Sequence, residues 1–288
     1  MNYIKLFYYI LILSIILPNI ITNVSTKESK KIVFYVAGNP GGTVFEISNE
    51  LKQHLLKFNY DVHLEVSGNC ISAQKQFLDA KHPALLLSFN AMAAHEECSM
   101  IVPTKDSLVS NLFSARLLFC GRPEKNNLQI IKSNQKTLVG LSADYPKTMV
   151  TSLGNNIKSV TYQNSGAILA GFLAGDIDFF ISNFSRGKQL MQQNKATCFA
   201  VTGDKSFSGV PPAMQVFPEW KYNDTLWLKA IIQNNFSKEE KELLTSHIQQ
   251  ISKSQDWQDY AKKNNFVTDT AIGYEVFVNS LKNWKISN

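Results

Sequence analysis

Residues 31–43 read Lys-Ile-Val-Phe-Tyr-Val-Ala-Gly-Asn-Pro-Gly-Gly-Thr, and this stretch decides the fold class. Residues 31–37 form an apolar run rich in β-branched and aromatic side chains, which predicts a buried, parallel strand. Val44, Ile47 and Leu51 then recur at helical spacing, so a helix running to Phe58 is predicted directly after the glycines. A strand, a glycine turn and a helix together are the opening unit of an α/β fold.

The alternation of strand and helix continues beyond this unit and then begins again. Strands are predicted over residues 62–66 and 84–89, with a helix over 72–80, and residues 108–120 favour a further strand. After a polar segment, strands are predicted over 137–141, 157–162, 177–181 and 197–202, and helices over 145–153 and 167–174. A last strand over 225–232 precedes helices over 237–252, 255–264 and 274–284, the first of them starting at a Ser237–Glu240 capping box.

The restart follows a strand without a long linker, which predicts a second α/β lobe of the same kind, joined by a crossing strand. Each lobe is expected to be a mostly parallel sheet flanked by helices. The predicted organisation is a signal segment over residues 1–25, the first part of lobe 1 over 26–118, lobe 2 over 119–221, and a return to lobe 1 with C-terminal helices over 222–288.

The N-terminus has the layout of a secretory signal. Lys5 precedes an apolar run over residues 6–17, Pro18 breaks the run, and a polar stretch follows. The run is shorter than the ~18–20 residues that a membrane span needs, and cleavage is expected within residues 23–26. An uncleaved anchor is the alternative. The mature chain is expected to be exported and soluble.

Four cysteines occur, Cys70, Cys98, Cys120 and Cys198, and none of them forms a C-x-x-C motif. In an exported chain this number permits two disulfides, with three possible pairings. We expect Cys70 to pair with Cys98, because both follow strands of lobe 1, which leaves Cys120 to pair with Cys198. Free, buried cysteines are the alternative.

Charge and motif content argue against several function classes. The formal net charge is +6 over 288 residues, but the basic residues are spread along the chain, which disfavours nucleic acid as a partner. The five histidines form no H-E-x-x-H motif, and no G-x-S-x-G motif occurs. We therefore predict no enzyme activity, no metal and no cofactor.

The glycine loop, residues 38–43, allows two interpretations. Glycines let the backbone come close to a ligand, and a helix start offers free N–H groups and partial positive charge, which together make an anion site. The alternative is a tight strand-to-helix turn with no ligand.

Several segments together resemble one protein family. Residues 36–43, Val-Ala-Gly-Asn-Pro-Gly-Gly-Thr, are similar to the "P-x-P-A-G-G-G-T-D" opening of the tripartite tricarboxylate transporter receptors, the Bug solute-binding proteins. Residues 160–167 and 173–183 resemble that family's "V-P-Y-K-G-G-A-P-A" and "L-L-G-G-Q-V-D-L-M-F-D-N" segments. Weaker likenesses follow in the same order at residues 198–202, 209–211 and 236–239, so the resemblance covers essentially the whole mature chain.

The resemblance implies a monomeric periplasmic receptor, with a two-lobed periplasmic binding protein-like fold, that captures a small carboxylate in the cleft between its lobes and delivers it to integral-membrane permease subunits. The residues it places at the ligand are Gly38, Asn39, Pro40, Gly41, Gly42, Thr43, Ser88, Asn90, Ser142, Ala143, Asp144, Tyr145, Tyr162, Gln163, Ser182 and Asn183.

Two positions depart from the family pattern. Val44 stands where the family has an aspartate, and the small second-lobe loop contains Asp144. An Asp144 side chain facing the cleft would repel a carboxylate and would favour an amino-acid-like ligand. Two other functions stay open: an exported, hydrolase-like enzyme using Asp176, Asp178 or Ser165, and a sensor or scaffold module.

Overall fold

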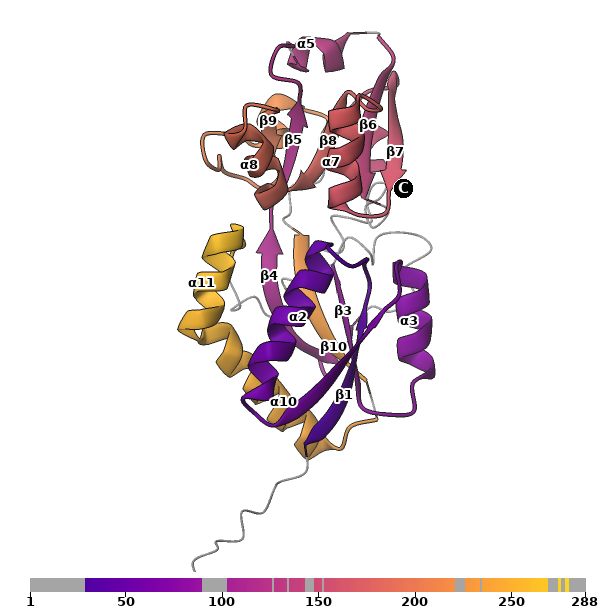
Figure 1. Ribbon diagram of the computed structural model, residues 1–288, viewed down its shortest axis with the longest axis vertical. Coiled ribbons are helices and arrows are strands. Elements are labelled where there is room, and N and C mark those ends of the chain that lie inside the picture. Colours follow the sequence, from indigo (N-terminus) through magenta and orange to yellow (C-terminus); the bar gives the residue numbers. More distant parts are fainter. Residues whose placement is uncertain are drawn as a thin grey trace, which may run out of the picture. The chain divides into compact units, whose positions relative to one another are not determined.

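The computed structural model of the chain (Figure 1) describes residues 29–89, 103–125, 127–133, 135–142, 148–151, 153–220, 226–233, 235–268, 274–275 and 278–279. The predicted signal segment, residues 1–25, lies outside these ranges, as do Asn90, Cys98, Ala143, Asp144 and Tyr145.

Lobe 1 is built on a five-stranded sheet with the order β2-β1-β3-β10-β4. The strands are β1 (Lys30–Val36), β2 (Tyr60–Val66), β3 (Ala84–Phe89), β4 (Leu108–Ala115) and β10 (Leu226–Ile232). β1 and β3 are parallel, with Val36 opposite Leu87, whereas β10 runs antiparallel to both of its neighbours, β3 and β4. β10 therefore returns to lobe 1 as an interior strand between β3 and β4, and the sheet is mixed.

Four helices cover this sheet: α2 (Thr43–Leu56), α3 (Cys70–Asp79), α10 (Lys238–Lys253) and α11 (Gln255–Asn264). α2 buries Val44, Ile47, Leu51 and Leu55, the stripe that the helical spacing predicts. α10 starts at the predicted capping box, with the Ser237 Oγ accepting from the Glu240 N–H at 3.2 Å. α11 stacks Trp257 on Phe113 of β4 at 4.5 Å between ring centroids.

Lobe 2 is built on a second five-stranded sheet, with the order β7-β6-β8-β5-β9. Its strands are β5 (Leu117–Gly121), β6 (Thr137–Ser142), β7 (Ile157–Tyr162), β8 (Phe179–Asn183) and β9 (Thr197–Val201). β6 is parallel to β7 and β8, and β5 is antiparallel to β8 and β9. The helices are α5 (Asn127–Lys132), α6 (Thr148–Thr151), α7 (Ser165–Ala174), α8 (Phe184–Gln192) and α9 (Ala213–Val216).

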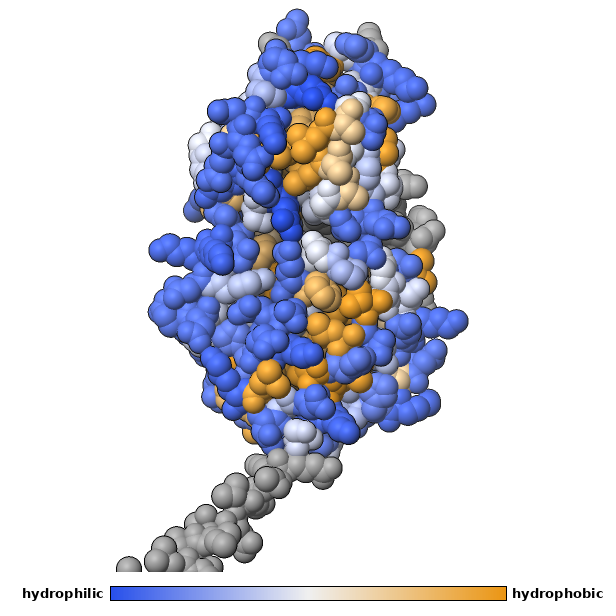
Figure 2. Space-filling view, viewed as in Figure 1, coloured by the Kyte–Doolittle hydropathy of each residue, from blue (hydrophilic) through white to orange (hydrophobic). Residues whose placement is uncertain are grey.

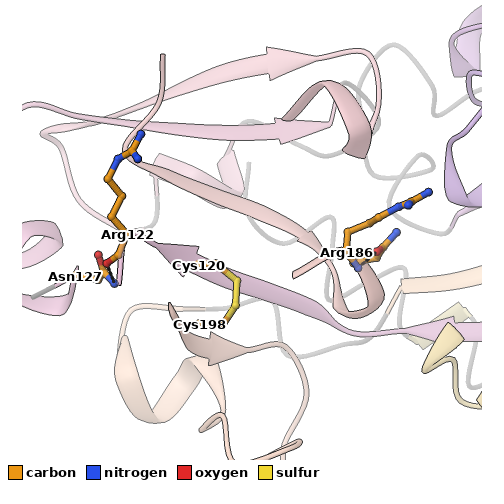
Figure 3. Close-up of a disulfide and its surroundings, with 6 residues drawn as sticks. Cys120, Arg122, Asn127, Arg186 and Cys198 are labelled. Atoms are coloured by element: carbon orange, nitrogen blue, oxygen red, sulfur yellow. Dashed lines mark hydrogen bonds between the residues drawn. A yellow bond between two sulfur atoms is a disulfide. The ribbon is translucent and has the colours of Figure 1, made fainter. Parts of the chain in front are cut away.

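One disulfide fastens β5 to β9 inside lobe 2 (Figure 3). Cys120 and Cys198 lie opposite each other in the strand register, with their Cα atoms 4.0 Å apart. The predicted pairing of these two cysteines is confirmed. Cys70, at the start of α3, is also disulfide-bonded, and its predicted partner Cys98 lies outside the described residues.

The chain crosses from lobe 1 to lobe 2 at Arg116, the single residue between β4 and β5. The Arg116 carbonyl accepts from the Phe184 N–H at 2.9 Å, and its guanidinium donates to the Lys205 carbonyl at 2.9 Å. The same guanidinium lies 4.9 Å from the centroid of the Phe207 ring. Lobe 2 thus holds the crossing residue through both its backbone and its side chain.

Hydrophilic side chains cover most of the face shown in Figure 2. Large hydrophobic side chains that remain exposed include Leu56, Leu78 and Leu173, which come from three different helices. Within the described part of the chain, no helix is both long enough and apolar enough to cross a membrane.

Candidate functional site

The loop of residues 38–42 leads into α2 without a side-chain cap. Gly41 has a φ of 77°, in the left-handed region that glycine adopts without steric cost. The Gly42 N–H donates to the Asn39 carbonyl at 2.9 Å, and Gly42 then serves as the N-cap of α2. The N–H groups of the first helical turn are therefore open to an anion, and the helix dipole favours negative charge at the same point.

Lobe 2 presents a second helix start at α7. Asn164 is its N-cap, and the Asn164 Oδ1 accepts from the Ala167 N–H at 2.9 Å. This cap satisfies one N–H group of the first turn. Ser165, the first residue of α7, follows directly after it.

A cavity of about 20 Å³ lies between these two helix starts. It is lined by Gly38, Asn39, Gly42, Thr43, Val44 and Phe89 from lobe 1 and by Ser142, Gln163, Asn164 and Ser165 from lobe 2. A water molecule needs roughly 10–15 Å³, whereas small-molecule sites measure about 300 Å³ or more. An organic ligand can therefore occupy this position only when the lobes move apart.

A larger groove, of about 630 Å³, runs along α10 in lobe 1. Leu108, in its lining, pairs with Ile231, at the end of the sheet away from Phe89. Its rim mixes charges, with the Lys238 Nζ 3.9 Å from a Glu242 carboxylate oxygen. The smaller cavity is the better candidate because polar groups from both lobes converge on it.

Asn39 bridges the two lobes beside the cavity. Its Nδ2 donates to the Gln163 carbonyl at 3.1 Å and to the Gly68 carbonyl, within lobe 1, at 3.2 Å. One side-chain amide thus ties the glycine loop both to the end of β2 and to the loop that precedes α7.

A second bridge joins Thr43 to Asn183. The Asn183 Nδ2 donates to the Thr43 Oγ1, and both residues are buried. The Asn183 Oδ1 accepts from the Arg186 N–H at 3.1 Å and so caps α8. The start of α2 is therefore in contact with the start of α8 as well as with the cavity.

Arg186 of α8 forms an ionic bridge to Glu46 of α2. Its guanidinium donates to the Glu46 carboxylate at 2.7 Å and to the Gly41 carbonyl at 3.4 Å. The two charged side chains are 32% and 41% exposed, so solvent screens the pair. The contact helps to hold α8 against the first turn of α2.

Six of the predicted ligand residues meet at the cavity: Gly38, Asn39, Gly42, Thr43, Ser142 and Gln163. Asn90, Ala143, Asp144 and Tyr145 lie outside the described residues. The structure adds four lining residues that were not predicted: Val44, Phe89, Asn164 and Ser165. Asn164 carried a usable signal, because an asparagine just before an apolar helical run is a typical N-cap.

Ser88, a predicted ligand residue, does not line the cavity, because side chains alternate between the two faces of a strand. It directly precedes Phe89, which lines the cavity, so the Ser88 side chain lies on the opposite face of β3 from the Phe89 side chain. In the register, Ser88 and Asn111 both lie opposite Lys229 of β10. Lys229 is buried, and this burial lowers its pKa to about 7.

The other predicted ligand residues that the structure describes do not line the cavity. Gly41 and Pro40 belong to the loop, and the Gly41 carbonyl faces Arg186. Tyr162 packs its hydroxyl against Gly171 of α7, and burial raises the pKa of that phenol. Ser182 is fully buried, and its hydroxyl has no hydrogen-bond partner among the described residues.

Asp176 and Asp178, the carboxylates of the hydrolase alternative, lie at the other end of α7 from the cavity. With ten residues in α7, the two ends are about 15 Å apart. The Asp178 carboxylate accepts from the Leu138 N–H at 3.0 Å, which fixes the turn into β8. Ser165, the third residue of that alternative, lines the cavity.

Neither a protein-family model nor a curated protein matches this sequence. Solved structures do resemble it. The periplasmic binding protein BugD is similar over 90% of this chain and 95% of its own, with a TM-score of 0.72 and 15% identity. MatC from Rhodopseudomonas palustris, solved with malate, gives a TM-score of 0.72 at 12% identity over 90% of this chain and 98% of its own. Rpa4515 from R. palustris, solved with adipate, gives a TM-score of 0.74 at 12% identity over 91% of this chain and 96% of its own. The chain therefore has the two-lobed α/β fold of periplasmic binding proteins.

Proposed function

We propose that this chain is an extracytoplasmic solute-binding receptor of the Bug type that captures a small organic carboxylate between its lobes. The observation that carries the proposal is the meeting of the α2 and α7 N-termini, one from each lobe, at a single cavity. Both direct N–H donors and positive potential to the same place, which suits a carboxylate. Two proteins of this fold are described with malate and adipate, which supports the assignment.

On this proposal, binding is a hinge motion about the crossing at Arg116. A carboxylate enters while the lobes are apart and binds the uncapped start of α2. Because the cavity holds only about one water molecule in this structure, closure around a ligand stops short of this arrangement: α7 approaches the ligand, and the long Arg186 side chain still reaches Glu46. The backbone N–H groups replace the water that the ligand loses, so its charge stays hydrogen-bonded while buried.

The proposal extends to the location and the partners of the chain. Residues 1–25 then act as a cleaved secretory signal, and the mature protein works as a monomer in the periplasm. It passes its ligand to integral-membrane permease subunits. Mass spectrometry of the exported protein tests the first step: an N-terminus within residues 23–26 is expected, and a retained leader contradicts cleavage.

The binding function is tested by thermal unfolding with straight-chain acids of three to six carbons and their neutral amides. A ligand at a hundred times its Kd should add about 2.7 kcal/mol and raise Tm by about 5–10 °C. The matched amides should have little effect. If no carboxylate raises Tm, the receptor proposal is wrong.

Two glycine variants test the position of the site. Gly41 and Gly209 have similar backbone conformations, with φ of 77° and 80°, and an added Cβ would meet nothing within 4 Å at either position. Gly41→Val should strain the loop whose neighbouring residues line the cavity and remove the ligand-induced rise in Tm, whereas Gly209→Val, with the same strain in a loop that does not line the cavity, should keep it. An equal response in both variants would contradict the loop assignment.

A further inference from the structure

The two helix starts at the cavity supply about one unit of positive charge. Each helix N-terminus is equivalent to roughly half an elementary charge, and α2 and α7 contribute one N-terminus each. A single carboxylate matches that sum. A second carboxylate would need compensation from another group.

The ion pair beside the cavity is already balanced. Arg186 and Glu46 are 2.7 Å apart, so each neutralises the other. A ligand group that recruited either side chain would have to break this contact between α8 and α2. The pair therefore stabilises the contact between α8 and α2 and leaves no unpaired charge of its own for a second charged group on the ligand.

Val44 and Phe89 give the cavity an apolar wall. They are only 3% and 4% exposed, and Val44 packs against Gly38, where an added Cβ would lie 3.5 Å from the Val44 Cβ. A charged group set against these side chains would lose its water without gaining a hydrogen bond, which is strongly unfavourable. Alkyl surface in the same place would be stabilised by burial.

From these three observations, and resting on the proposed function, we propose that the ligand is a monocarboxylate with an apolar body, selected by Val44 and Phe89. The carboxylate lies at the helix starts and the alkyl part lies against the two side chains. This choice excludes both dicarboxylates and amino-acid-like ligands as preferred ligands.

Matched ligands test the proposal by isothermal titration calorimetry on the purified protein. Each set shares one chain length and differs at the far end: butyrate, γ-aminobutyrate and succinate; valerate, 5-aminovalerate and glutarate; hexanoate, 6-aminohexanoate and adipate. In every set that binds, the alkyl acid should bind at least about tenfold more tightly than the other two. If the diacid or amino acid binds as tightly, the inference is overturned and the carboxylate receptor stands. If no carboxylate binds in any assay, both proposals fail.

Val44→Asp tests the wall directly. Position 44 lies in the first turn of α2, where the helix dipole offsets part of the cost of burying an acidic side chain, and thermal unfolding without ligand checks that the variant is folded. It should weaken alkyl acid binding about tenfold and reverse the preference towards the amino acid of the same set. Val44→Thr, which keeps the size of the side chain, should reduce the ratio between the affinities for the alkyl acid and the amino acid without reversing it. An unchanged order of affinities in both variants would overturn the role of Val44.

Discussion

Replacing Arg186 with methionine should weaken ligand binding by a factor of about two to five while leaving the fold intact. The change removes the guanidinium that donates to Glu46 at 2.7 Å and to the Gly41 carbonyl at 3.4 Å. Methionine keeps much of the length and the apolar stem. The variant therefore probes the bridge between α8 and α2 more than local packing.

The magnitude follows from the exposure of the pair. With side chains 32% and 41% exposed, the contact contributes about 0.5–1 kcal/mol. On the proposed function, closure around the ligand keeps this contact, so the variant loses its free energy from closure and the apparent Kd rises about two- to fivefold. Because the pair is partly exposed, the difference between the wild-type protein and the variant should shrink at high salt.

Calorimetric titration at low and high ionic strength measures both effects. Glu46→Gln and the double variant complete a cycle in which the two changes should be less than additive. Arg122→Met is a matched control, because Arg122 donates to the Phe172 carbonyl within lobe 2 and makes no hydrogen bond or ion pair with the described residues of lobe 1. Equal Kd values for Arg186→Met and the wild-type protein, or an equal loss with Arg122→Met, would refute the reasoning.

Two further predictions concern stability. The disulfide between Cys120 and Cys198 spans a sequence separation of 78, for which the chain-entropy relation gives a stabilisation of about 4.5 kcal/mol. Replacing both cysteines with alanine should therefore lower the free energy of unfolding, measured by urea titration, by up to that amount. A loss below about 1 kcal/mol would contradict the relation for this disulfide. Burial lowers the pKa of Lys229 from 10.5 to about 7. Between these two pH values the unfolded chain binds more protons than the folded protein, so Lys229 makes the free energy of unfolding rise with pH across this window. Lys229→Met should lack this rise, and a difference from the wild-type protein that does not vary with pH would show that Lys229 does not titrate as described.

Elements buried on both sides were predictable from sequence. The strand over 84–89 agrees residue for residue with β3, because helices on both faces leave it a continuous apolar run. α8 was not predicted. It buries Phe184, Gly187 and Leu190, and the middle position gives no hydrophobic signal. Glycine stands there because an added Cβ would lie 2.8 Å from the Leu118 Cδ1, a contact that only the tertiary structure reveals.

The candidate site was partly predictable because several of its residues are neighbours in the sequence. Gly38, Asn39, Gly42 and Thr43 follow a strand and open a helix, so local sequence places them together. Phe89 joins them through the alternation of β3, which depends on which face of the strand meets the cavity. The pairing of Cys120 with Cys198 likewise depends on the order of β5 and β9 in the sheet, and the sequence alone left three pairings open.

The position of β10 has a consequence for the order of folding. All strands of lobe 2 lie between β4 and β10 in sequence, so lobe 2 is contiguous and lobe 1 is not. The two pairings that β10 makes in the lobe 1 sheet, with β3 and with the edge strand β4, close a loop that contains the whole of lobe 2. Ordering lobe 2 first shortens that loop and reduces the entropy lost when β10 docks. A chain that emerges from its N-terminus can therefore complete lobe 2 while β1–β4 still lack their last neighbour, and lobe 1 closes only when residues 226–232 arrive.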